Sequence, residues 1–428
     1  MEKTLEIYPL SEAPNANIKI PGSKSHSNRA LICAALSDGV SILNGLLLAD
    51  DTQAMLSCLN DLGVIIDVNE SEKCCTVNGI GGFPFSESGY KAVDARQSGT
   101  TARFILPLLA AGTGKFILDG HDQLRNRPIK ELVDVLNKIG ANISGTKIPL
   151  NIIGSQPMAN KGSNVLEISG SVSSQYISGL MMASASMPNG LIINVVDDPV
   201  SKPYIDLTRH TMNEFGAEVD IDKNYRKITI KATGYKCTEI EIEPDASAAS
   251  YFFAAAAVTT GKVRINGLGS NTIQGDLEFI QILEKMGCQV EITENWVEVV
   301  GTGSLNGVKV DMSNISDTAQ TLAIVATFAN TPTEITGIGF IRAKETNRVN
   351  AVATELNRLG INATETQDGL IIEPGKPNPG VINTYDDHRM AMSFSLLGLR
   401  YSGIKLSNPN CVNKTFPEFF QKLEELRN

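Results

Sequence analysis

At 428 residues the chain is too long for one ordinary hydrophobic core, so two domains are expected. Hydrophobic residues make up 42% and charged residues 20%, which excludes the collagen-like and disordered classes. A net charge of −10 argues against nucleic acid as a partner, although local cations can still hold small anions. Seven scattered cysteines and an N-terminus without a secretory pattern predict a reducing, cytoplasmic location. Because the apolar windows are too short to cross a bilayer, no membrane partner is expected.

A two-helix unit recurs six times along the chain. The second helix of each unit is amphipathic, and the first five copies are predicted to end at Gly63, Gly140, Gly216, Gly287 and Gly360, at intervals of 71 to 77 residues. The sixth copy is the C-terminal FPEFFQKLEELRN. An alternating segment follows each glycine, as expected where a left-handed glycine ends a helix and a strand begins.

The first helix of each unit has a different composition. Runs such as ALICAALS, FILPLLAAG and SYFFAAAAV are rich in small apolar residues on nearly every side, which predicts buried helices. These helices are expected to begin after polar turns, which read GSKSHSNRA, QSGTTAR, SGSVSSQ, EPDASAA, SNISDTAQ and TYDDHRM.

The repeat predicts an α/β (α+β) fold of two domains, each built from three βαβαββ units with buried inner helices. The third unit ends near Ile240, so we expect an N-terminal domain over residues 22–240 and a C-terminal domain over residues 1–21 plus 241–428. The opening segment TLEIYPL is expected to supply the strand that the sixth unit lacks. Two chain crossings near residues 21–22 and 240 predict a hinge, with the active site in the interdomain cleft.

Cations gather at the polar turns that open the helices, at Lys24, Arg29, Arg127, Lys344, Arg348, Arg389 and Lys414. A helix N-terminus offers unpaired N–H groups and a positive dipole end, and arginine adds bidentate recognition of carboxylate or phosphate. Taken singly, each cation is more often a solvated surface charge, and each nearby serine more often a helix cap. Their recurrence at near-equivalent positions favours a shared anion-binding site.

Three acidic positions stand out beside these cations: Asp317 in NISDTAQ, Glu345 in AKETNR, and Asp386-Asp387 in YDDHRM. Asp317 is equally compatible with helix capping, and Glu345 with a simple ion pair to Lys344. His388 is one of four histidines and lies in a dense polar run before an apolar helix. The chain has no GxGxxG, GxxxxGK[ST], GxSxG, HExxH or CxxC motif, so neither a cofactor nor a metal is expected.

The polar turns, in this order, resemble those of the 5-enolpyruvylshikimate-3-phosphate synthase family of enolpyruvyl transferases. The resemblance covers essentially the whole chain and is carried by PGSKSHSNRA, QSGTTAR, RNRP, SGSVSSQ, VSKPYID, KETNR, YDDHRMAM and NKTFPEFF. It implies transfer of the enolpyruvyl group of phosphoenolpyruvate to the 5-hydroxyl of shikimate 3-phosphate, through a tetrahedral ketal that then releases phosphate. The reaction belongs to the shikimate pathway, which leads to chorismate and the aromatic amino acids, and the family implies a monomer.

The same resemblance implies site residues. Shikimate 3-phosphate would be held by Ser23, Lys24, Arg29, Ser173, Ser174, Gln175, Ser201, Tyr204, Asp317 and Lys344. Phosphoenolpyruvate would be held by Lys24, Gly99, Arg127, Gln175, Arg348, Arg389 and Lys414. The catalytic candidates are Asp317 as proton acceptor, Lys24 and Glu345 as further proton-transfer groups, and His388.

Three residues depart from the family pattern: Gln97 and Asn347 replace the usual asparagine and acid, and Phe340 lies where some members have an asparagine. One alternative is the same-fold transferase that acts on UDP-N-acetylglucosamine. That relative has a cysteine before its phosphoenolpyruvate arginine, whereas the loop GHDQLRNRP has none. The other alternative is a non-catalytic anion-binding scaffold, which is expected to have lost acid–base residues that this chain retains.

Overall fold

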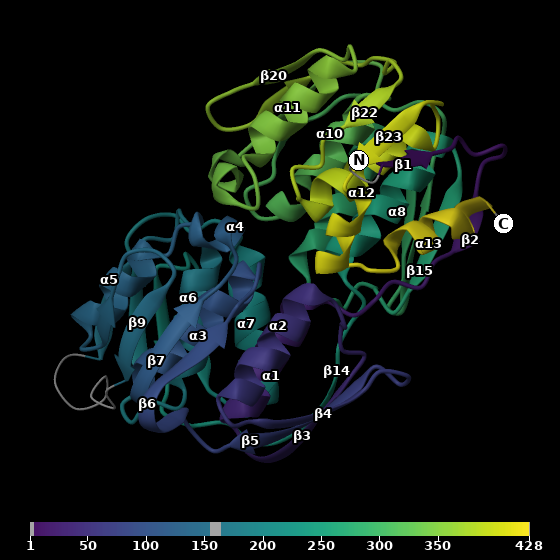
Figure 1. Ribbon diagram of the computed structural model, residues 1–428. Helices are drawn as coiled ribbons and strands as arrows, with labels where there is room; N and C mark the ends of the chain where they lie inside the picture. The colour runs from purple at the N-terminus through teal and green to yellow at the C-terminus, as the bar shows by residue number, and fades with distance from the viewer. Residues whose placement is uncertain (1–3, 155–163, 428) are drawn as a thin grey trace. The chain divides into compact units, whose positions relative to one another are not determined.

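The computed structural model describes residues 4–154 and 164–427 (Figure 1). The chain forms two compact units, Gly22–Ile242 and Met1–Pro21 with Glu243–Asn428. Strand β14, Glu239–Glu241, pairs in parallel with β3, Asp38–Asn44. This pairing carries the Gly22–Ile242 unit past residue 240, where the sequence placed the boundary.

Three four-stranded sheets form the Gly22–Ile242 unit, with the orders β14-β3-β5-β4, β6-β7-β9-β8 and β10-β11-β13-β12. In each sheet the first two strands are parallel and the remaining pairs are antiparallel. The further strands are β4 Ile65–Asn69, β5 Cys74–Ile80, β6 Phe85–Asp94, β7 Thr113–Asp119, β8 Asn142–Ser144, β9 Leu150–Gly154, β10 Val165–Ile168, β11 Leu191–Val195, β12 Val219–Ile221 and β13 Lys227–Ile230.

Each of these sheets belongs to a repeat with one inner helix and at least one outer helix. The inner helices are α1 Lys24–Leu36, α3 Gly99–Ala111 and α6 Ser174–Ser184. The outer helices are α2 Asp50–Asp61, α4 Asp122–Arg125, α5 Lys130–Lys138 and α7 Lys202–Glu214. Every residue of α3 is buried, and all of α6 except Gln175, as the small-residue pattern predicts.

The second unit repeats the same plan, with sheets β16-β17-β15-β2, β18-β19-β21-β20 and β1-β23-β22. Its strands are β1 Thr4–Ile7, β2 Asn15–Asn17, β15 Lys262–Asn266, β16 Gln289–Ile292, β17 Trp296–Val300, β18 Lys309–Asp311, β19 Thr333–Thr336, β20 Ala363–Glu365, β21 Leu370–Ile372, β22 Gly380–Ile382 and β23 Ile404–Ser407. Its inner helices are α8 Ala246–Thr259, α10 Ala319–Ala326 and α12 His388–Gly398. Its outer helices are α9 Phe279–Met286, α11 Arg348–Arg358 and α13 Phe419–Glu424. The 3₁₀ turns are η2 Gly275–Glu278, η3 Ser316–Thr318, which leads directly into α10, η4 Gly339–Ala343, η5 Pro409–Lys414 and η6 Glu425–Arg427.

The N-terminal segment contributes to two sheets of this second unit. β1 pairs antiparallel with β23, which confirms the prediction that TLEIYPL supplies a strand to the sixth repeat. The sequence did not predict that β2 pairs in parallel with β15, in the repeat of α8. β2 precedes α1 in the chain and β14 precedes α8, yet each pairs in the sheet of the other helix. The two units therefore exchange their first edge strands.

The predicted helix ends agree with the structure. The five glycines after the second helices all have positive φ, between 79° and 115°. The prediction that the first helices begin after the polar turns is wrong, because the helices start inside those turns. Ser23, Ser98, Ser173, Asp245 and Asp387 accept a hydrogen bond from a backbone N–H of the first turn and so fix an earlier start.

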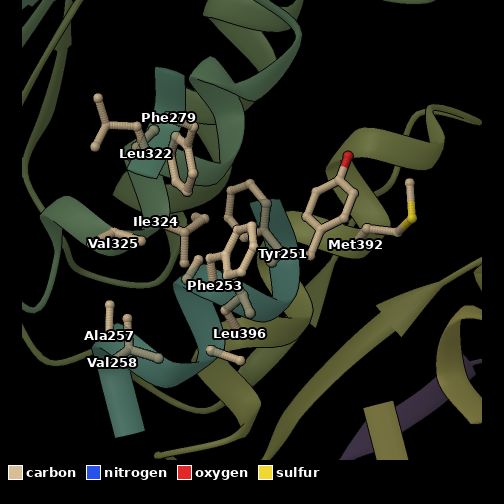
Figure 2. Close-up of a cluster of buried hydrophobic side chains, with 14 of the residues drawn as sticks. Tyr251, Phe253, Ala257, Val258, Phe279, Leu322, Ile324, Val325, Met392 and Leu396 are labelled. Atoms are coloured by element: carbon tan, nitrogen blue, oxygen red, sulfur yellow. The ribbon is translucent and has the colours of Figure 1, made fainter. Parts of the chain in front are cut away.

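The core of the second unit forms around its three inner helices. All residues of α8, α10 and α12 are buried. Figure 2 shows side chains of this cluster, with Tyr251 and Phe253 from α8, Leu322 from α10 and Leu396 from α12. The alanines of α8 leave room for close helix approach, while aromatic rings fill the space beside them. This packing fixes the helix N-termini, where the candidate site residues lie.

Candidate active site

The first candidate group lies at the N-terminus of α1. Ser23 caps this helix by accepting a hydrogen bond from the His26 N–H at 3.3 Å. Lys24 is the first helical residue, and its Nζ lies 3.5 Å from Oδ2 of Asp51, a buried residue of α2. The carboxylate therefore holds the lysine at the start of the helix, in the positive end of the helix dipole.

Arg29 is directed into the protein rather than outward. Its Nε donates to Thr208 Oγ1 at 2.7 Å, and its Nη2 donates to Ser178 Oγ and the Tyr204 carbonyl, both at 3.1 Å. Its guanidinium also lies 5.1 Å from the centre of the Phe104 ring. Burial lowers the pKa of Arg29 to about 10, so the group remains charged at neutral pH. Contact between Arg29 and a substrate stays a prediction, because most of its N–H groups already bind the protein.

Gly99 and Arg127 occupy the start of α3. Gly99 is the first residue of this helix, and a Cβ built there would lie 2.5 Å from Nη1 of Arg127. Arg127 is 7% exposed. The glycine therefore leaves the space that the guanidinium occupies above the helix N-terminus, where N–H groups and arginine together favour an anion.

Gln175 lies at the start of α6 and is held by α3. Its Oε1 accepts a hydrogen bond from Arg103 Nη1 at 2.6 Å, and its Nε2 donates to Thr100 Oγ1 at 3.1 Å. Arg103 also donates to the Pro128 carbonyl at 3.0 Å, in the segment after Arg127. Sequence reasoning missed this role of Arg103, although Arg103 lies in the polar turn QSGTTAR that it singled out.

The remaining serines of this unit have different local roles. Ser173 caps α6 by accepting from the Gln175 N–H at 3.3 Å, and Ser174 is buried beside it. Ser201 precedes α7 with φ of 56° and makes no side-chain cap. Tyr204 lies in the first turn of α7, and its carbonyl accepts from Arg29 and from Thr208.

In the second unit Asp317 joins two arginines. It lies in η3 rather than at a helix cap, so its side chain is available for ion pairs. Its Oδ2 lies 2.6 Å from Arg389 Nη2, and its Oδ1 lies 3.3 Å from Arg348 Nη1. Arg389 also donates to the Asp317 carbonyl at 2.8 Å and to the Tyr251 hydroxyl at 3.2 Å. Burial raises the pKa of Tyr251 to about 12, so this hydroxyl stays neutral.

Arg348 is the centre of this charged cluster. Its Nε lies 2.8 Å from Asp387 Oδ2, and its Nη2 lies 2.7 Å from Glu345 Oε2. Burial acts to lower the pKa of Arg348, but Asp387, Glu345 and Asp317 outweigh it and raise that pKa above its usual range. Lys414 Nζ lies 3.9 Å from the other oxygen of Glu345. Arg348, Arg389 and Lys414 are thus interleaved with three carboxylates.

His388 is the first residue of α12, with its side chain 1% exposed and its Nδ1 3.7 Å from Asp387 Oδ1.

Lys344 follows η4, with its Nζ 5.9 Å from the centre of the Phe340 ring. Phe340 thus offers Lys344 an aromatic face at the position where some relatives have an amide. Asn347 caps α11 by accepting from the Asn350 N–H, a role that an acid would fill equally well.

The structure therefore brings the predicted residues into two groups, one on each unit. Sequence reasoning missed the partners that hold them, chiefly Asp51, Arg103, Thr208 and Tyr251. Tyr251 had a signal, since its hydroxyl lies at the start of the long apolar run FFAAAAV. Among residues 4–154 and 164–427, no cluster of three or more His, Cys, Asp or Glu side chains is arranged to hold a metal. In the same residues, no helix is both long enough and apolar enough to cross a membrane.

Within the described residues, six repeats of strands around an inner helix, with cations and carboxylates near several helix starts, are the arrangement of the enolpyruvyl transferase fold class. The family model described as EPSP synthase (3-phosphoshikimate 1-carboxyvinyltransferase) matches residues 11–423. The chain belongs to this family, which confirms the family and the fold class that the sequence predicted.

Individual relatives agree with this assignment. The 3-phosphoshikimate 1-carboxyvinyltransferase of Nostoc punctiforme is 42% identical over 99% of this chain and 100% of its own length. The protein 3-phosphoshikimate 1-carboxyvinyltransferase 2 of Halalkalibacterium halodurans is 40% identical over 99% of this chain and 94% of its own. The EPSP synthase structure from Acinetobacter baumannii superposes with a TM-score of 0.81 at 28% identity, over 99% of this chain and 98% of that one.

Proposed function

We propose that the chain transfers the enolpyruvyl group of phosphoenolpyruvate to the 5-hydroxyl of shikimate 3-phosphate and releases phosphate. The observation that carries this proposal is the pairing of Asp317 with Arg389 and Arg348, beside Glu345 and Lys414. This arrangement combines carboxylates for proton transfer with cations for a phosphate in one buried place. The comparisons do not favour the alternative acceptor UDP-N-acetylglucosamine.

The residues divide between the two substrates as the family resemblance implies. Shikimate 3-phosphate is bound by the serines, Lys24, Arg29, Gln175 and Tyr204 of the Gly22–Ile242 unit, with Asp317 and Lys344 from the other unit. Phosphoenolpyruvate is bound mainly by Arg348, Arg389 and Lys414, with Lys24, Gly99, Arg127 and Gln175.

In the second group, phosphoenolpyruvate would meet cations that carboxylates already hold. Three cations are matched by the carboxylates of Asp317, Glu345 and Asp387, so the group is not an excess of positive charge in this protein of net charge −10. Incoming phosphoenolpyruvate competes with these carboxylates for the guanidinium groups. Competition frees Asp317 and Glu345 from part of their ion pairing, and so makes them better proton acceptors when substrate is present.

We propose proton transfers that the family resemblance implies. The 5-hydroxyl loses a proton to Asp317 as its oxygen attacks the enolpyruvyl carbon, and Lys24 or Glu345 protonates the methylene carbon. The tetrahedral ketal then loses a proton from the methyl group and expels phosphate, whose charge the arginines and Lys414 stabilise. We further propose that the chain acts as a monomer in the cytoplasm.

Phosphate release by the purified protein tests the function. The protein is supplied with phosphoenolpyruvate and either shikimate 3-phosphate or UDP-N-acetylglucosamine, without added metal. Release with shikimate 3-phosphate alone supports the proposal, and release with the nucleotide sugar alone contradicts it. Binding of ligands without release by either acceptor favours the non-catalytic scaffold.

Asp317→Asn tests the assigned proton acceptor. The amide keeps the shape and one hydrogen-bond acceptor but cannot take the proton, so kcat is expected to fall by roughly 10²–10⁴. The measurement is steady-state kinetics at varied shikimate 3-phosphate, where KM is expected to stay within about threefold, which corresponds to about 0.65 kcal/mol of binding free energy. A rise of KM with kcat unchanged would show that Asp317 binds substrate without transferring its proton.

A further inference from the structure

A strained turn before α12 connects the elements that carry Arg348, Arg389 and Lys414. Tyr385 and Asp386 are consecutive residues, neither is glycine, and both have φ of 54°. This left-handed conformation is unfavourable for residues with a Cβ, and two in succession persist only where the surroundings hold them. The next residue is Asp387, which caps α12 and pairs with Arg348.

Tyr385 attaches this turn to α11. Its hydroxyl donates to Glu355 Oε1 at 2.7 Å. Glu355 is 1% exposed and also accepts from Arg358 Nη1 and from the Asn383 N–H. Burial, followed by the hydrogen bond to Glu355, raises the pKa of Tyr385 to about 12, so the hydroxyl remains a donor at neutral pH. The helix to which the turn is attached begins with Arg348.

Asp386 attaches the same turn to η5. Its Oδ1 accepts a hydrogen bond from Asn408 Nδ2 at 2.9 Å. Asn408 itself has φ of 41° and directly precedes η5, which ends at Lys414. The turn therefore has one attachment to the element of Arg348, one to the element of Lys414, and a direct continuation into α12, which contains Arg389.

We propose that the Tyr385–Asp386 turn is a positioning device that sets the relative geometry of Arg348, Arg389 and Lys414, and that Tyr385 and Asp386 are positioning residues for the phosphoenolpyruvate site. Neither residue needs to touch substrate. The inference rests on the proposed function, which assigns phosphoenolpyruvate to these three cations. Loosening either attachment lets the three cationic elements shift, and small displacements of positioning groups are costly to the reaction.

Tyr385→Phe is the first test, because it removes one hydroxyl and keeps the ring. We expect kcat/KM for phosphoenolpyruvate to fall about tenfold, with KM for shikimate 3-phosphate within about twofold. Tyr225→Phe is the matched control, since Tyr225 also has a left-handed φ of 57° and donates its hydroxyl to Asp206, but lies in the other unit. The control is expected to leave kcat/KM for phosphoenolpyruvate unchanged. If Tyr385→Phe lowers only the thermal unfolding midpoint, the inference is wrong.

Substitutions of Asp386 separate positioning from general destabilisation. Asp386→Asn keeps the acceptor for Asn408 and tolerates the left-handed region, so it is expected to retain wild-type kinetics. Asp386→Ala loses the acceptor and keeps the strain, and is expected to behave like Tyr385→Phe. Equal kinetics for the alanine and asparagine variants would overturn the proposal. Glu355→Gln provides a second way to weaken the α11 attachment if a turn variant fails to fold.

Arg389→Lys distinguishes failure of this inference from failure of the proposed function. If Arg389→Lys leaves KM for phosphoenolpyruvate unchanged, the substrate assignment itself is wrong. If that variant raises KM while Tyr385→Phe and Asp386→Ala do not lower kcat/KM, the assignment stands and only the positioning role of the turn is refuted.

Discussion

At the scale of single residues, the surroundings of each side chain decide what its chemistry can do. Arg29 and Arg348 are both buried arginines, but Arg29 is surrounded by hydroxyls and two backbone carbonyls, whereas Arg348 is surrounded by carboxylates. Burial therefore lowers the pKa of Arg29, while three anions raise that of Arg348. The sequence shows the same residue type at both positions and cannot distinguish these two settings.

Gly99→Ala tests a contact at this scale. The new Cβ would lie 2.5 Å from Nη1 and 2.6 Å from Cζ of Arg127, so the guanidinium has to move. We expect KM for phosphoenolpyruvate to rise roughly tenfold, because a displaced arginine would lose part of the bidentate contact that we propose it makes with this substrate. Steady-state kinetics at saturating shikimate 3-phosphate measure the effect.

The control for Gly99→Ala is Gly375→Ala, since a Cβ there meets only ordinary contacts of 3.4 Å or more to Ile361. That variant is expected to keep wild-type kinetics. An unchanged KM in Gly99→Ala would show that Arg127 can move without loss of binding, or that it does not bind phosphoenolpyruvate.

At the scale of elements, the inner helices position the site by close packing. In the Gly22–Ile242 unit α3 and α6 touch through Gly179, where a Cβ would lie 2.5 Å from the Arg103 carbonyl oxygen. The side chain of the same residue, Arg103, holds Gln175 at the start of α6. The spacing between these two helices therefore controls both the core and the orientation of Gln175.

Gly179→Ala tests this packing. Alanine has the better helix propensity by about 1 kcal/mol, but a backbone oxygen at 2.5 Å cannot rotate away, so the helices must separate. We expect a net loss of about 1–3 kcal/mol in the free energy of unfolding, measured by urea denaturation. A variant as stable as the wild type would mean that the two helices are free to separate at little cost.

At the scale of the whole molecule, the exchange of edge strands determines which stretches of the chain contain all the strands of their own sheets. The Gly22–Ile242 unit contains every strand of its three sheets within the described residues, including β14. Residues 243–428 lack β1 and β2, which come from the first 21 residues. We expect the limits of the two units to be domain boundaries, and their positions result from this exchange of strands.

Expression of separate fragments tests this organisation. A fragment of residues 22–242 is expected to unfold cooperatively on heating, whereas a fragment of residues 243–428 leaves strand edges of β15 and β23 unpaired and is expected to be unstable. Thermal unfolding followed by circular dichroism measures both. Adding residues 1–21 to the second fragment as a peptide is expected to restore cooperativity. Stable folding of residues 243–428 alone would contradict the requirement for these strands.

The sequence by itself determined the features that depend on neighbouring residues. Glycines after amphipathic helices, polar turns before small-residue helices, and the order of those turns defined the six repeats and the family. These signals are local, because a cap or a left-handed glycine acts within one helical turn. The family resemblance then supplied the candidate site residues.

Only the tertiary structure decided the features that join distant parts of the chain. The pairing of β2 with β15, the inward direction of Arg29, and the contact of Asp317 with Arg389 each connect residues separated by tens to hundreds of positions. A hydrophobic pattern fixes which face of a strand or helix is buried but not which partner covers it. Ion pairs and strand partners follow from packing of the complete repeats, because their energies depend on distances that local sequence does not set.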